Sequence, residues 1–129
     1  MPQRFLVTKE FGALLGVLSH PCRLQIVEEL QDREYDVNTL QTLLNISHSG
    51  VSQHLTLLRA HRVVIERREG RHVYYRLRRP ELATWLLDGL RFLEDEREVV
   101  EQIGSAVESV RRLWTITKNE EQSRTQNEE

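Results

Sequence analysis

The spacing of apolar residues in the first third of the chain predicts two helices. Apolar side chains crowd residues 5–18, so a helix there has a large apolar surface and is expected to need a partner. A second helix is expected to follow Ser19 or His20 as its cap, with Pro21 in its first turn. The residues of this helix that are expected to face inward are Leu24, Ile26, Val27 and Leu30.

Two further helices joined by a tight turn are predicted next. Asp36 or Asn38 is a suitable cap for the first of them, and residues 45–47 form the turn. Ser47 then caps the second helix, which holds residues 48–59. The residues that the first of these helices is expected to bury are Leu40, Leu43 and Leu44.

Residues 63–68 and 72–77 are predicted to pair as a two-stranded hairpin. Along the second strand, apolar and polar side chains alternate, which is the period of a strand with one buried face. Glu69 and Gly70 are expected to supply the turn between the strands.

A seven-residue apolar repeat predicts a long helical region after the hairpin. Gly89 and Gly104 interrupt this region, so the pattern leaves open whether residues 80–117 form one helix or two. A single domain is expected over residues 1–117, followed by a polar, disordered tail over residues 118–129. The repeat is carried by Leu86, Leu93, Val100, Val107 and Trp114.

Charge is segregated along the chain, although the net charge of its 129 residues is only −2. Residues 59–79 hold eight arginines against two glutamates, whereas residues 81–129 hold twelve acidic against six basic residues. Such segregation favours one surface that meets a polyanion and another that is kept away from it. A hairpin whose charges are merely solvated is the simpler alternative.

Composition bears on the compartment of the protein. A single cysteine, Cys22, excludes an internal disulfide and suits a reducing cytoplasm. No run approaches the roughly 20 apolar residues that a membrane span needs, and the N-terminus lacks the cleavage site of an export signal. We therefore expect a cytoplasmic protein with no membrane partner.

The predicted helix over residues 48–59 has an exposed face without carboxylates. At about 100° per residue, Val51, Leu55 and Leu58 fall on one apolar stripe. The opposite side holds short hydrogen-bonding side chains and one arginine, so it can approach the major groove of DNA closely. The residues on this side are Ser49, Ser52, Gln53, Thr56 and Arg59.

The histidines of this stretch do not have the spacing of a metal site. His48 and His54 lie on different sides of a helix, and His54 and His61 stand two turns apart, roughly 10.5 Å. Two histidines that share a metal on a helix are usually about four residues apart. We therefore predict neither a metal site nor a cofactor.

The order short helix, turn, carboxylate-free helix and arginine-rich hairpin predicts a winged helix-turn-helix. The fold class is mainly α, with about five to six helices and the two-stranded hairpin as the wing. The second helix would enter the major groove, while the wing reaches phosphates or the minor groove. The wing residues expected at the DNA are Arg67, Arg68, Arg71 and His72.

The chain resembles the ArsR/SmtB-type winged-helix repressors over residues 10–95. The resemblance is carried by LSHPCRLQIVEEL, NISHSGVSQHLTLLRAHRVV and RREGRHVYYRL. It implies a homodimer joined through its first and last helices that blocks transcription until an effector arrives. It also implies that Ser47, His48, Ser49, Ser52, Gln53 and His54 lie at or beside the DNA. The dimer interface would include Phe11, Leu14, Leu15, Leu86, Leu93, Val100 and Val107.

The chain departs from the family pattern at two metal sites and one turn. The positions that match the family's cysteine site are Asp36 and Asn38, and those that match its zinc site are Arg79, Glu81, Phe92 and Asp95. Neither set offers the thiolate or imidazole ligands that zinc prefers. His61 and Arg62 replace the usual glycine before the first strand of the wing, which puts the conformation of that turn in question.

Cys22 has more than one interpretation. It lies in the first turn of a helix beside Arg23, and both a helix N-terminus and a cation favour the thiolate and hence oxidation. A lone cysteine is more often a small buried apolar residue. A metal held by His20, Cys22 and another subunit, or an organic ligand between the first and last helices, also remains open.

The leading hypothesis is a sequence-specific dimeric repressor that binds an inverted repeat of double-stranded DNA. An effector would release it, either by oxidation of Cys22 or as a ligand that the sequence does not identify. The alternative is a winged-helix protein-interaction module that acts through the long acidic C-terminal helix. An enzyme is the weakest hypothesis, because no phosphate-binding loop, nucleophile elbow or carboxylate–histidine motif is found.

Overall fold

The computed structural model describes residues 2–94, 106–113 and 124. The chain divides into two compact units, Met1–Thr84 and Trp85–Glu129. The predicted domain boundary at residue 117 lies outside the described residues. Among the described residues, no helix has the length and apolar character to cross a membrane.

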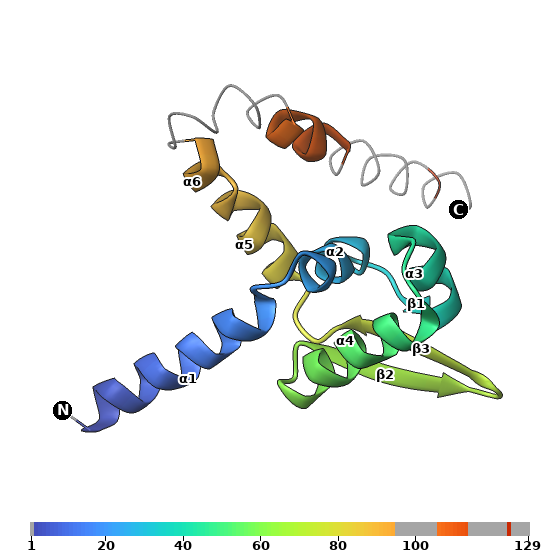
Figure 1. Ribbon diagram of the computed structural model, residues 1–129, viewed down its shortest axis with the longest axis horizontal. Coiled ribbons are helices and arrows are strands. Elements are labelled where there is room, and N and C mark those ends of the chain that lie inside the picture. Colours follow the sequence, from blue (N-terminus) through green and yellow to red (C-terminus); the bar gives the residue numbers. More distant parts are fainter. Residues whose placement is uncertain (1, 95–105, 114–123, 125–129) are drawn as a thin grey trace. The chain divides into compact units, whose positions relative to one another are not determined.

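The first unit has four helices before the hairpin (Figure 1). The helices are α1 (Pro2–Leu18), α2 (Pro21–Glu29), α3 (Val37–Leu44) and α4 (His48–Ala60). The strands are β1 (Tyr35–Asp36), β2 (Val64–Glu69) and β3 (His72–Leu77). Helix α5 (Glu81–Gly89) begins in the first unit and ends in the second. The predicted order of short helix, turn, helix and hairpin is confirmed.

Helices α2 and α3 each begin at a side-chain cap. The Nδ1 atom of His20 accepts a hydrogen bond of 3.0 Å from the backbone N–H of Cys22. In the same way, Oδ1 of Asp36 accepts a bond of 2.8 Å from the N–H of Thr39. Hydrogen bonding to Thr39 also holds the pKa of Asp36 below its ordinary value. These caps satisfy N–H groups that have no partner within the helix, so they define where each helix starts.

The core of the first unit lies where α2, α3, α4 and the base of the hairpin meet. Its most deeply buried side chains are Ile26, Val27, Leu30, Leu40, Val51, Leu55, Leu58, Val64 and Leu77. The prediction that Leu24 and Leu43 are buried is wrong, because they are 41% and 46% exposed. Both helices are short and only one side of each is covered; Leu24, for instance, lies about 160° around the helix from Ile26.

The wing is part of a three-stranded sheet and not only a two-stranded hairpin. The strand order is β1-β3-β2, and Tyr35 of β1 pairs with Tyr75 of β3. The predicted turn is shifted by one residue, because Glu69 still pairs with His72 and the loop is Gly70–Arg71. Gly70 has a φ of +60° at the first loop position, which is the glycine position of a type II′ turn.

The end of α4 has the hydrogen bonds of a Schellman motif. The N–H of Val63 donates to the carbonyl of Leu58 (2.9 Å), and that of Arg62 donates to the carbonyl of Arg59 (3.0 Å). This geometry requires a left-handed residue, and Arg62 has a φ of +58°. Glycine usually occupies such a position because a Cβ atom disfavours positive φ.

We expect the Arg62→Gly substitution to raise the free energy of unfolding by about 1 kcal/mol, because glycine adopts a positive φ without the steric cost. Chemical denaturation followed by circular dichroism measures the change. The control is Arg62→Ala, which removes the same charge but keeps a Cβ atom. Equal stabilisation by both variants would show that charge, and not backbone conformation, is the cause.

The helical region after the hairpin is interrupted within its described part. Helix α5 ends at Gly89, and a four-residue helix, α6 (Arg91–Glu94), follows it. Residues 106–113 are also helical. Gly89 is therefore the end of a helix, as its low helix propensity allows. Val100 and Trp114 of the seven-residue repeat lie outside the described residues.

Candidate nucleic-acid interface

The exposed face of α4 has the polar character that the sequence predicted. Gln53 and Thr56 are exposed, Ser52 is half-buried, and no acidic residue occurs between His48 and Ala60. The Thr56 hydroxyl donates to the carbonyl of Ser52 (2.8 Å), so its hydrogen is used within the helix. The Gln53 amide has both donors and an acceptor, which is the set needed to read a base edge.

A small cluster of hydroxyl groups marks the start of α4. Ser47 caps the helix by accepting a hydrogen bond of 3.1 Å from the N–H of Gly50, as predicted. The hydroxyl oxygens of Ser47 and Ser49 lie 3.3 Å apart, and His48 beside them is exposed. The positive end of the helix dipole lies at this cluster, so it can attract a phosphate.

Arg59 connects the last turn of α4 to the sheet. Its Nη1 atom lies 3.0 Å from a carboxylate oxygen of Glu66 in β2. The side chain of Arg59 is 50% exposed, so this pair holds the wing against the helix while one side of the guanidinium stays in contact with solvent. Arg59 therefore combines a structural contact with its predicted place beside the DNA.

Arg67 is the most heavily paired residue of the wing. Its guanidinium donates to both carboxylate oxygens of Glu34 at 3.0–3.2 Å and to Glu69 at 2.7 Å. It also lies over the ring of Tyr74, with 4.8 Å between its central carbon and the ring centroid. The hydrogen bond from Arg67 lowers the pKa of Glu34. Two carboxylates compensate the charge of Arg67. The attraction of Arg67 for a phosphate is therefore weaker than the sequence suggested.

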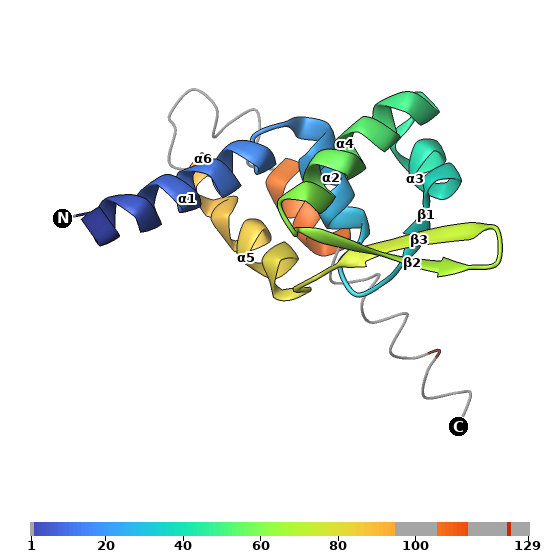
Figure 2. The same cartoon turned by 90° about the horizontal axis from the view of Figure 1, so that it is seen from below.

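Arg68, Arg71 and His72 occupy the outer part of the hairpin, and all three are exposed. Neither Arg68 nor Arg71 forms an ion pair with any residue that the structure describes. Both views of the fold show this end of the hairpin extending past α3 and α4 (Figures 1 and 2). Among the described residues, the arginines of the wing without an ion pair therefore include Arg68 and Arg71 toward its tip, together with Arg76 nearer its base.

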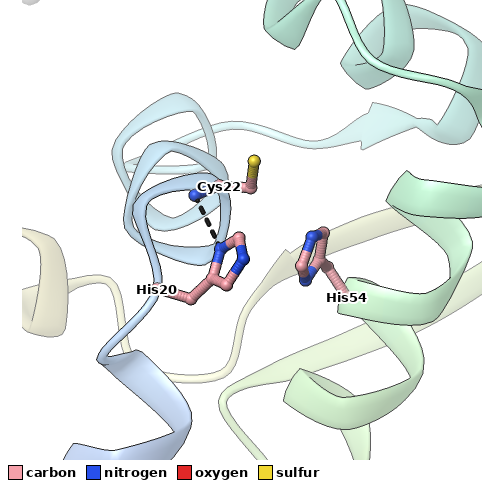
Figure 3. A group of neighbouring side chains, drawn as sticks. All are labelled: His20, Cys22 and His54. Atoms are coloured by element: carbon pink, nitrogen blue, oxygen red, sulfur yellow. Dashed lines mark hydrogen bonds between the residues drawn. The ribbon is translucent and has the colours of Figure 1, made fainter.

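His54 does not belong to the exposed face of α4. Its half-buried ring faces the ring of His20, the cap residue of α2, and the two ring centroids are 4.5 Å apart (Figure 3). Burial, followed by the charges of His20 and Arg23, lowers the pKa of His54. The structure thus separates His54 from the other residues that were predicted to contact DNA.

Cys22 lies beside these two histidines and is half-buried. One ligand-type atom from each of His20, Cys22 and His54 lies within 4.8 Å of the others. His20 and Cys22 are neighbours in the sequence, and a metal shared by these two was one expectation, whereas His54 was not expected beside them. Thirty-four positions separate His20 from His54 in the sequence, and no local periodicity brings them together.

The residues predicted to form a dimer interface differ in exposure. On α1, Phe11 and Leu15 are 50% and 39% exposed, whereas Leu14 is half-buried. In the last part of the chain Leu86 is half-buried, Leu93 is exposed and Val107 is buried; Val100 lies outside the described residues. Helix α1 exposes more apolar side chains than the other predicted region does among the described residues, because Phe5, Leu6 and Val7 are exposed as well.

A helix-turn-helix followed by a hairpin whose base packs on the second helix defines the winged helix-turn-helix class. The family described as bacterial regulatory protein, arsR family, matches residues 20–66. The chain belongs to this family, since the match runs from the cap of α2 into β2. In addition, two relatives described below are at least 30% identical over the aligned residues, and the chain covers 79% and 100% of their own lengths.

Two curated relatives and one solved structure illustrate the similarity. The HTH-type transcriptional repressor SmtB of Mycobacterium tuberculosis is 40% identical over 79 residues, which are 61% of this chain and 58% of SmtB. The transcriptional repressor PagR of Bacillus anthracis is 32% identical over 60% of this chain and 79% of its own length. Reduced HlyU from Vibrio cholerae superimposes with a TM-score of 0.62 and 30% identity, over 74% of this chain and all of HlyU. This chain therefore spans less than two thirds of SmtB.

Proposed function

We propose that this protein is a sequence-specific DNA-binding transcriptional regulator that acts as a repressor. The observation that carries the proposal is the combination of a carboxylate-free exposed helix face with a wing whose tip arginines form no ion pair with any described residue. Membership of a family of bacterial regulatory proteins supports it, as do relatives that are named transcriptional repressors.

The proposal includes a cytoplasmic homodimer. The exposed apolar side chains of α1 support it, because large apolar side chains exposed together on one helix are typical of a surface that meets a partner. Two copies of α4 would then enter successive major grooves of an inverted repeat, with centres about 34 Å apart. Release by an effector belongs to the same proposal. Oxidation of Cys22 by hydrogen peroxide stays a prediction, with Cys22→Ser as its control.

The test is a fluorescence-anisotropy titration of the full chain against duplexes from its own upstream region. We expect Gln53→Ala to reduce the ratio between specific and non-specific affinity by about 5- to 160-fold, because one bidentate base contact supplies about 1–3 kcal/mol of discrimination. Arg71→Ala should weaken binding to all duplexes alike, since phosphate contacts carry no sequence information.

Two results would contradict these roles. Equal loss of affinity for every duplex in Gln53→Ala would remove the assignment of Gln53 to base recognition. Failure of the unmodified chain to retain any duplex at roughly 100 mM salt would contradict DNA binding itself. The second result would favour the interaction-module alternative instead.

A further inference from the structure

His20, Cys22 and His54 form a cluster of metal-ligand types in the first unit (Figure 3). His20 precedes α2, Cys22 lies in its first turn, and His54 projects from the middle of α4 toward them. All three side chains are half-buried, so they are shielded from bulk solvent but remain accessible to a small ion. Imidazole nitrogen together with a thiolate is the ligand set preferred by zinc and by copper(I).

The distances allow the three side chains to share an ion after small movements. The ligand atoms lie within 4.8 Å of one another. Ligand atoms around a tetrahedral zinc ion stand roughly 3.3–3.6 Å apart, given its bond lengths to nitrogen and sulfur. The cluster must therefore contract by about an ångström, which rotation of the side chains can supply. Three ligands complete a trigonal site, whereas a tetrahedral ion would keep one position for water.

We infer that His20, Cys22 and His54 bind one thiophilic cation, Zn²⁺ or Cu⁺, and that this ion is the effector of the proposed regulator. The cysteine binds as its thiolate, so its proton is released to solvent when the ion enters. The effector role rests on the proposed function, whereas the binding site does not. This site is distinct from the positions that match the family's metal sites, since none of its ligands occurs among them.

The cap of α2 connects the ion to the protein backbone. In the neutral imidazole of His20, Nδ1 accepts the N–H of Cys22, so the ring proton lies on Nε2. An ion bound at Nε2 moves that proton to Nδ1, and an ion bound at Nδ1 takes the lone pair directly. In both cases α2 loses its cap hydrogen bond, so binding of the ion changes the start of α2.

His54 carries the same event to the DNA-binding helix. His54 follows Gln53 directly in α4. Its side chain lies on the side of α4 that faces α2. An ion that draws His54 toward His20 and Cys22 changes how α4 is held against α2. Because Gln53 must match a base edge closely, we expect the ion to weaken DNA binding, as release of a repressor requires.

Metal binding is tested on the full chain, purified without a polyhistidine tag, reduced and metal-free. Co²⁺ substitutes for Zn²⁺ and reports a thiolate ligand by its charge-transfer absorption; Zn²⁺ then displaces it. A separate anaerobic titration against a chromogenic chelator measures Cu⁺. We expect one ion per chain, and an affinity that falls about 100-fold or more in Cys22→Ser and His54→Gln, since even the loss of an outer partner costs roughly 10- to 100-fold.

Two further variants distinguish the loss of a metal ligand from a loss of folded structure. His20→Asn removes a ligand but keeps a good helix cap, so it should lose the ion and remain folded. His61→Gln removes an exposed histidine at the end of α4 and should bind the ion as the unmodified chain does. Binding that persists unchanged in Cys22→Ser and His54→Gln, or no binding of either ion, would overturn the site.

DNA affinity measured with and without the ion tests the effector role. We expect Zn²⁺ or Cu⁺ to weaken binding of the specific duplex by about tenfold or more, within the range usual for coupled sites, and to have no such effect on His20→Asn. Tight DNA binding that is indifferent to a bound ion would overturn the effector role. An ion bound by a chain that never binds DNA would contradict the proposed function while the site stands.

Discussion

The double substitution Arg68→Ala/Arg71→Ala is expected to weaken DNA binding at least about tenfold and to flatten its salt dependence. Each arginine that contacts a phosphate releases about one counterion, so the slope of log affinity against log salt should fall by about 2 per protomer. Both side chains are exposed and neither is paired with a described residue, so their full charge is available to the duplex.

The matched control for the wing is Glu34→Gln/Arg67→Gln. It removes an existing ion pair and leaves the net charge unchanged. Because Glu34 already compensates Arg67, the salt slope should stay as it is in the unmodified chain. Titrations at four or five salt concentrations give the slope for each variant. If the salt slope falls as much in Glu34→Gln/Arg67→Gln as in Arg68→Ala/Arg71→Ala, Arg67 and not the tip of the wing contacts the DNA.

The second large effect is expected in the core, on the buried side of α4 opposite its exposed polar face. Leu55 is 1% exposed and lies on the side of α4 that packs on α2, α3 and β2. Leu55→Ala should lower the free energy of unfolding by about 3 kcal/mol, because it removes buried apolar surface and leaves a cavity that the neighbouring helices cannot fill. Urea denaturation measures the loss.

Leu57→Ala is the control for this prediction. Leu57 lies two positions away on the same helix, but it is 36% exposed. The same change in side chain and helix propensity should therefore cost less than about 1 kcal/mol. Equal losses at the two positions would contradict the assignment of Leu55 to the inner face of α4.

Local chemistry accounts for the parts of the fold that were predictable. His20, Asp36 and Ser47 cap their helices through neighbours two or three residues away, so the start of each helix can be found from sequence. The stripe of α4 and the alternation in β3 also depend on short periods. The two-residue strand β1 is too short to show a period, and it exists only because β3 lies beside it.

Contacts distant in sequence account for most of what was missed at the candidate site. Arg67 contacts Glu34 only when the sheet has formed. No residue near Arg67 in the sequence indicates that Glu34 accepts hydrogen bonds from it through both carboxylate oxygens. The position of His54 depends likewise on the packing of α4 against α2. Successive residues of a strand point to opposite faces, so the side chains of Arg67 and Arg68 leave β2 on opposite sides of the sheet.

The short strand β1 connects the middle of β3 to the helix-turn-helix. Asp36 pairs with Tyr74 of β3 and also caps α3, so this part of the hairpin cannot open without disturbing the start of the helix. Around Gly70 only the β2–β3 pairing holds the chain, and such segments open independently of the rest. The wing is thus held from its base to its middle and is compliant at its tip. In the proposed complex, this compliance would let Arg71 follow the backbone of differently shaped duplexes while the rest of the wing stays in place.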